Sequence, residues 1–88
     1  MLKTIIANNT APYDGIFKIS HGGGNPYVAV FIRSGDTYYI ENIPPGEKIT
    51  ATFGENWDND RKMFTKNVYS LYLGEATPIR RSTQRHEW

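Results

Sequence analysis

Turn-forming residues divide this chain into short segments, and their spacing is the feature that most constrains the fold. Clusters of Gly, Pro, Asn and Asp recur at intervals of roughly eight to twelve residues, which is typical of an all-β sandwich or barrel. The runs between them are rich in β-branched and aromatic residues, and none shows the periodicity of a helix. We therefore expect strands at residues 2–7, 16–20, 27–33, 37–41, 48–53, 68–73 and 78–82.

Two local patterns predict how some of these strands are arranged. In FIRSGDTYYI the turn of Ser34, Gly35 and Asp36 separates two β-rich arms, which predicts an antiparallel hairpin. Gly35 suits the left-handed backbone conformation that such a turn requires. In KITATF, residues 48–53, the apolar side chains alternate with polar ones, so we expect the polar face to be exposed to solvent.

The chain must be stabilised by packing alone, because its 88 residues include no cysteine for disulfides or thiolate metal sites. Six Tyr, four Phe and two Trp supply a core from few residues, since each ring buries a large area. We expect an all-β fold, a small antiparallel seven-strand β-sandwich of Ig-like or prealbumin-like type over residues 1–78, followed by a basic tail over residues 79–88. The expected core consists of Phe17, Val30, Phe31, Ile32, Ile49, Phe53, Phe64 and Leu71.

The charge balance excludes some classes of partner. Ten Lys and Arg against nine Asp and Glu give a net charge of +1, so we expect no nucleic-acid partner and no membrane partner. The apolar run in the segment MLKTIIANNT is too short for the core of a signal peptide. No apolar run elsewhere approaches membrane-spanning length. We expect the protein in the cytoplasm or in a virion, unless a leader was removed.

The stretch HGGGNP, residues 21–26, raises the question of hydrolase activity, because lipases and esterases aim backbone N–H groups at an oxyanion with a similar motif. The chain contains no G-x-S-x-G nucleophile elbow, and its other histidine is His86. We therefore expect no enzymatic activity. The glycines are interpreted as a tight reversal between two strands, and His21 as an incidental loop residue.

The acidic segment 58–60, with Glu55 nearby, carries oxygen ligands of the kind that Ca²⁺ binds. An EF-hand loop starting at Asp58 would need Gly at its sixth position and Glu at its twelfth, where this chain has Met63 and Tyr69. Solvated surface acids are the simpler interpretation. We expect no metal and no cofactor.

Aromatic residues are the candidates for a binding surface. Tyr38 and Tyr39 are adjacent, so in a strand one faces inward and the other outward. An outward tyrosine beside Tyr69 or Tyr72 would form a patch of the kind that contacts proteins or glycans, and half-buried strand tyrosines are the alternative. Trp57 in the GENWDND segment is expected to cover one open end of the sandwich, with ligand stacking as the alternative.

The segment YYIENIPPGEKITATFG, residues 38–54, resembles the strand, I-P-P-G turn and strand of small transthyretin-like or carboxypeptidase-regulatory-like β-sandwich domains. In such a turn the prolines end one strand, and Gly46 takes the left-handed conformation. The segments NNTAPYDGIFKI, IPPGEKITATFGENWDND and FTKNVYSLY are also similar to an uncharacterised family of bacterial and phage-associated modules. The resemblance covers residues 4–73 and implies a sandwich without a shared active site.

Together these patterns predict a non-enzymatic structural or interaction subunit that self-assembles, as a virion or filament component, through strand edges and the C-terminal tail. Arginines in the tail can donate forked hydrogen bonds to a neighbour's carboxylates, and its last aromatic residue can anchor in an apolar pocket. The alternatives are a module that binds a small ligand or glycan, and a phage-encoded inhibitor of a host protein. The expected interaction residues are Tyr38, Tyr39, Trp57, Arg80, Arg81, Arg85 and Trp88.

Overall fold

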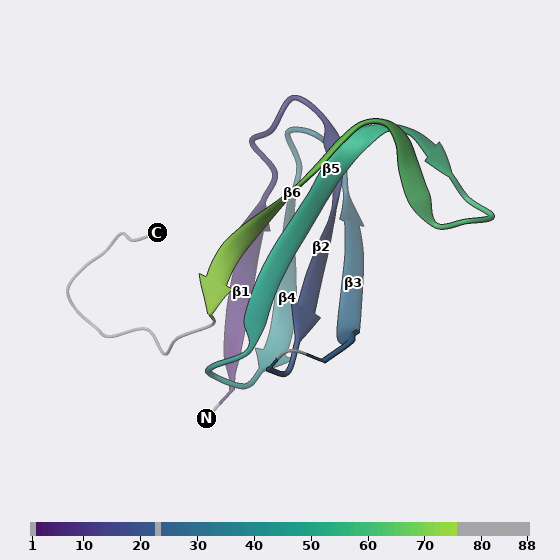
Figure 1. The fold of residues 1–88 in the computed structure, drawn as a ribbon. Coiled ribbons are helices and arrows are strands. Elements are labelled where there is room, and N and C mark those ends of the chain that lie inside the picture. Colours follow the sequence, from purple (N-terminus) through teal and green to yellow (C-terminus); the bar gives the residue numbers. More distant parts are fainter. Residues whose placement is uncertain (1, 23, 76–88) are drawn as a thin grey trace.

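The computed structural model describes residues 2–22 and 24–75 of the chain. In these residues the fold is all-β, with six strands in two antiparallel sheets and no helix (Figure 1). The seventh strand predicted at residues 78–82 and the predicted tail, residues 79–88, lie outside the described residues. This part of the chain has no helix that could cross a membrane. The strands are β1 (Lys3–Asn8), β2 (Asp14–Ser20), β3 (Pro26–Ile32), β4 (Thr37–Ile43), β5 (Lys48–Asp58) and β6 (Met63–Glu75).

The two sheets differ in width. β1 pairs with β4 in a two-stranded sheet, and the order β3-β2-β5-β6 forms a four-stranded sheet (Figure 1). Two connections between successive strands, β2 to β3 and β5 to β6, are antiparallel hairpins. The other three connections cross between the sheets.

The predicted hairpin between the third and fourth strands is therefore wrong, because β3 and β4 belong to different sheets. Gly35 does adopt the expected left-handed conformation, with φ 88°. Its N–H, however, donates to the Asn9 carbonyl at 2.8 Å, and the Asn9 N–H donates to the Asp36 carbonyl at 2.9 Å. The buried Asn9 side chain also donates to the Ile32 carbonyl at 2.8 Å. These bonds attach the turn to the end of β1, so β4 continues along β1.

The core lies between the two sheets. The face of the four-stranded sheet that packs against β1 and β4 is called the inner face here, and it carries Phe17, Ile19, Ala51 and Phe53. Val28, Val30 and Ile49 are partly buried and pack against this core. The buried residues contributed by the two-stranded sheet are Ile5, Ala7, Ile40 and Ile43.

A β-bulge explains why two residues of β4 at odd spacing are both buried. Lys3 pairs with Ile43 and Ile5 pairs with Ile40, so β4 has one extra residue between these pairs. Asn42 has φ 65°, the left-handed conformation that asparagine tolerates better than most residues. In a regular strand Ile40 and Ile43 would point to opposite faces, and the extra residue makes both point inward.

Four of the predicted core residues are buried as expected: Phe17, Ile32, Phe53 and Phe64. The predicted burial of Leu71 is wrong, since its side chain is about half exposed. Leu71 does lie on the inner face, opposite Ala51, but on the edge strand β6. We attribute its exposure to the width of the covering sheet, which has two strands against four.

The predicted core position of Phe31 is also wrong, and the cause is an arm formed by the ends of β5 and β6. Phe31 pairs with Ile16 on the outer face of the four-stranded sheet, and it remains partly exposed. Beyond Gly54 the two strands continue as a ribbon that projects from the sheets (Figure 1). Trp57 and Phe64 of this arm pack on Phe31, with ring centroids 5.4 and 6.0 Å away. A second, smaller apolar cluster therefore forms on the outer face.

Gly54 allows the arm to approach so closely. A Cβ atom at this position would lie 2.6 Å from Cβ of Phe64, closer than real Cβ atoms come to one another. Phe53 pairs with Tyr69 and Glu55 pairs with Lys66, so β6 has one extra residue, a bulge, opposite Gly54. The sequence predicts the end of this strand at residue 53, whereas β5 continues to Asp58.

Candidate functional site

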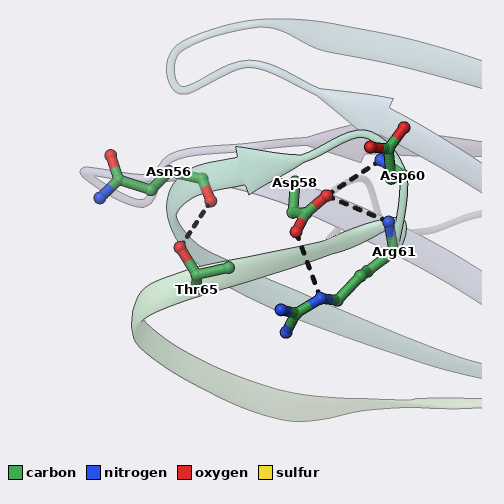
Figure 2. A network of polar contacts seen from close by, with 5 residues as sticks. All are labelled: Asn56, Asp58, Asp60, Arg61 and Thr65. Carbon is green, nitrogen blue, oxygen red and sulfur yellow. Dashed lines mark hydrogen bonds and ion pairs between the residues drawn. The ribbon is translucent and has the colours of Figure 1, made fainter.

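The acidic segment at the tip of the arm is used to build a turn. One oxygen of Asp58 accepts hydrogen bonds from the backbone N–H groups of Asp60 at 3.0 Å and Arg61 at 3.1 Å (Figure 2). The other oxygen lies 3.4 Å from Nε of Arg61. Nearby, the Thr65 hydroxyl donates to the Asn56 carbonyl at 2.9 Å. Within residues 2–22 and 24–75, no cluster of three or more His, Cys, Asp or Glu could hold a metal ion.

The interpretation of His21 as an incidental loop residue is wrong, because its side chain contacts a buried acid. Its Nδ1 lies 3.0 and 3.2 Å from the two carboxylate oxygens of Glu47. With the carboxylate ionised, Nδ1–H is the donor. The Glu47 side chain is only 7 % exposed, whereas that of His21 is 89 % exposed. The buried carboxylate of Glu47 thus receives its hydrogen bond from His21, which lies in the loop between β2 and β3.

Tyr27 completes this arrangement. Tyr27 is about half exposed. Partial desolvation of its hydroxyl, the charge of Glu47 and a hydrogen bond to the Glu47 carboxylate raise the pKa of Tyr27 above the ordinary value of 10.0. The interpretation of the glycines as a tight reversal is confirmed, since β2 and β3 are antiparallel on either side of them and Gly22 has φ 62°. Gly46, one residue before Glu47, has the predicted left-handed conformation, with φ 87°.

The chemistry available to the His21–Glu47 pair is limited. A carboxylate on Nδ1 orients an imidazole as in a general base, but nucleophilic catalysis also needs a hydroxyl or thiol at the other nitrogen. In the described residues the hydrogen bonds of the His21 imidazole go to Glu47. Sequence reasoning missed this contact because 26 residues separate its two members. The geometry supports a structural role, in which the pair holds the β2–β3 loop against the β4–β5 connection.

The two adjacent tyrosines of β4 point to opposite faces, as predicted. Tyr38 pairs with the buried Ala7, so it lies on the inner face of its sheet, while Tyr39 pairs with Ile6 on the outer face. Tyr39 is 60 % exposed and Ile6 is 52 % exposed. Tyr39 therefore has Ile6 as its cross-strand neighbour, whereas Tyr69 and Tyr72 lie in the other sheet.

The remaining predicted interaction residues are divided between the arm and the tail. Trp57 lies in β5 and not in a loop over the end of the sandwich. Its ring packs on Phe31 and Phe64 at centroid distances of 5.4 and 4.9 Å. The four predicted tail residues, Arg80, Arg81, Arg85 and Trp88, lie outside the described residues.

The longest run of exposed apolar side chains in the described residues lies on β6. The sequence indicates Tyr69 and Tyr72 as surface candidates but not the rest of this run. The sequence signal is the segment VYSLYL, in which apolar residues occupy both faces of a strand. On an edge strand one or both faces can remain uncovered. The exposed residues of this run are Val68, Tyr69, Leu71, Tyr72 and Leu73.

The fold and these surfaces define a small all-β module with open strand edges and exposed apolar side chains. No family model, no curated protein and no solved structure matches this chain. Its function must therefore be argued from its own residues.

Proposed function

We propose that this protein is a non-enzymatic interaction subunit that assembles with other protein chains, a second copy included. The observation that carries the proposal is the exposure of large apolar side chains on two open strands, β4 and β6. Monomeric soluble proteins rarely expose large contiguous apolar surfaces, and such surfaces commonly mark interaction sites. A role as a virion or filament component is the form of this function that we favour.

Two observations support a binding role over an enzymatic one. The carboxylate of Asp58 is engaged by two backbone N–H groups and by Arg61. The carboxylate of Glu47 is engaged by His21. Both acids thus have structural partners, whereas Tyr39 and Ile6 present their side chains to solvent.

We propose in addition that the two sheets form an Ig-like or prealbumin-like sandwich related to the transthyretin-like domains, with a seventh strand at residues 78–82. The I-P-P-G turn supports this, because Pro44 and Pro45 end β4 and Gly46 turns the chain toward β5. Residues 79–88 then act as an assembly arm. Deleting residues 83–88, which follow the proposed seventh strand, should leave a folded protein that assembles more weakly, and Trp88→Ala should weaken association by about 2 kcal/mol or more. Normal assembly of the truncated protein would refute the arm.

Sedimentation velocity and native mass spectrometry of the full chain test the main proposal. Between about 1 and 100 µM we expect a concentration-dependent shift from monomer to a defined oligomer. Ile6→Thr combined with Tyr39→Ser should weaken assembly if the outer face of the two-stranded sheet takes part. A wild-type chain that stays monomeric throughout this range would contradict self-assembly.

A further inference from the structure

β6 is an open edge of the four-stranded sheet. It pairs with β5 along one side, and no strand in the described residues pairs with the other. Natural edge strands are usually protected by charged residues, by proline or by short length. β6 has 13 residues, and its segment 68–73 contains neither a charge nor a proline. Its large side chains are between 38 and 58 % exposed.

The other open edges are better protected. β3 begins with Pro26, which has no N–H to donate, and its Phe31 end lies against the rings of Trp57 and Phe64. β1 includes Lys3 and β4 includes Glu41, so each carries a charge within a short strand, whereas the charges of β6, Lys66 and Glu75, lie outside its segment 68–73. Among the open edges, the segment 68–73 of β6 is thus the one with the fewest features that prevent another strand from pairing.

We infer that β6 pairs in antiparallel fashion with β6 of a second copy, which joins the two four-stranded sheets into one continuous sheet. This inference rests on the proposed function and specifies its contact. The pairing follows a two-fold axis perpendicular to the sheet at Ser70. Such an axis keeps both inner faces on the same side, so Tyr69 opposes Leu71 of the second copy and Val68 opposes Tyr72.

A second copy fits this edge for three reasons. An antiparallel copy offers matching backbone donors and acceptors along the regular segment, residues 69–72, where the pairing with β5 has no register shift. Because the run is uncharged, self-pairing brings no like charges together. The seventh strand proposed at residues 78–82 competes poorly for this edge, because it begins with a proline and carries Arg80 and Arg81.

The size of the surface sets the expected strength of the contact. A standard interface buries about 800 Å² on each partner, which is about one seventh of the 5868 Å² of accessible surface of this protein. A pairing centred on about five residues of one strand falls at or below that size. We therefore expect dissociation in the micromolar range.

A charge placed on the edge tests the inference. Leu71→Lys puts an ammonium group at the centre of the contact, and because Leu71 is half exposed in the monomer we expect the variant to fold. Dimerisation should weaken by about tenfold or more, since the charge would be buried without a partner. Ala29→Glu, which places a charge on the open edge of β3 opposite Lys18, is the control and should dimerise like the wild type.

A disulfide reports the register without relying on the charged variant. The chain has no cysteine, so Ser70→Cys introduces a single thiol beside the proposed axis. Mild oxidation should trap covalent dimers of Ser70→Cys and not of Ala29→Cys, because opposing residues in antiparallel strands have the spacing that a disulfide needs.

The outcomes separate this inference from the function on which it rests. If the wild type assembles but Leu71→Lys assembles equally well and Ser70→Cys traps no more dimer than Ala29→Cys, the β6 contact is wrong and the interaction function stands. If the wild type remains monomeric at all concentrations, the β6 contact and the proposed self-assembly both fail.

Discussion

Replacing Phe53 by Ala tests the assignment of the inner face most directly. The Phe53 ring is buried, with centroids 5.7 Å from Phe17 and 5.3 Å from Tyr69. It packs directly on Gly15, where a Cβ atom would lie 2.7 Å from the ring. Loss of such a ring costs about 3–5 kcal/mol through lost burial and a cavity. At about 0.05–0.15 kcal/mol per residue, a chain of this length has a free energy of unfolding of only about 4–13 kcal/mol.

We expect Phe53→Ala to lower the melting temperature by more than about 12 °C, since about 1 kcal/mol corresponds to about 4–8 °C in a domain of this size. Circular dichroism during heating and urea titration measures the loss. Leu71→Ala, on the same face but half exposed, is the control and should cost less than about 1.5 kcal/mol. Equal losses in the two variants, or an unchanged melting temperature for Phe53→Ala, would refute the packing described for this face.

Three further predictions follow from other parts of the structure. Gly54→Ala should destabilise the protein by more than about 1 kcal/mol in urea titration, because its Cβ would meet that of Phe64; a neutral effect would contradict the bulge. Glu47→Gln should lower the raised pKa of Tyr27, measured by NMR titration of labelled tyrosine; because the raised pKa stabilises the fold below pH 10 and this contribution is lost as the pH rises through the folded-state pKa, the wild type should lose stability more steeply than the variant above pH 10. Trp57→Ala should speed hydrogen exchange in the arm while leaving β2 protected, and equal exchange in both would show that the two clusters are not separate.

The six described strands could be located from local sequence because each contains a β-branched or aromatic run next to turn residues. The arm could not, because residues 54–62 are rich in turn-forming residues, and β5 and β6 extend beyond the predicted segments 48–53 and 68–73. Gly35 and Gly46 likewise have the predicted left-handed conformation. Which strands pair was less predictable, since the same turn at Gly35 serves a hairpin or a crossing between sheets. The choice depends on Asn9, whose backbone and side chain bond to residues 23 to 27 positions away.

Which side chains are exposed at the candidate surfaces depends on contacts between distant segments, and these cannot be predicted from the alternation of apolar and polar residues along a strand. Leu71 follows the pattern of a core residue, and only the width of the opposite sheet leaves it exposed. Phe31 belongs to the outer face, where the arm that covers it could not be inferred from a sequence interrupted by Gly54. The outward direction of one of the two adjacent tyrosines was predictable, because strand periodicity requires it.

The division of neighbouring strands between two sheets has a consequence for the rate of folding. The hairpins β2–β3 and β5–β6 close over short stretches of chain, whereas β1 pairs with β4 between residues as far apart as Lys3 and Ile43. Long-range pairing raises the contact order and slows folding, because chain entropy is lost before the contacts form. We expect the two hairpins to form early and the N-terminal strand to dock last, with low φ-values for substitutions at Ile5 and higher ones at Ile19. Before β1 docks, the part of the core that it covers would be exposed to solvent. The lifetime of this partly folded state would therefore determine how readily the newly made chain aggregates.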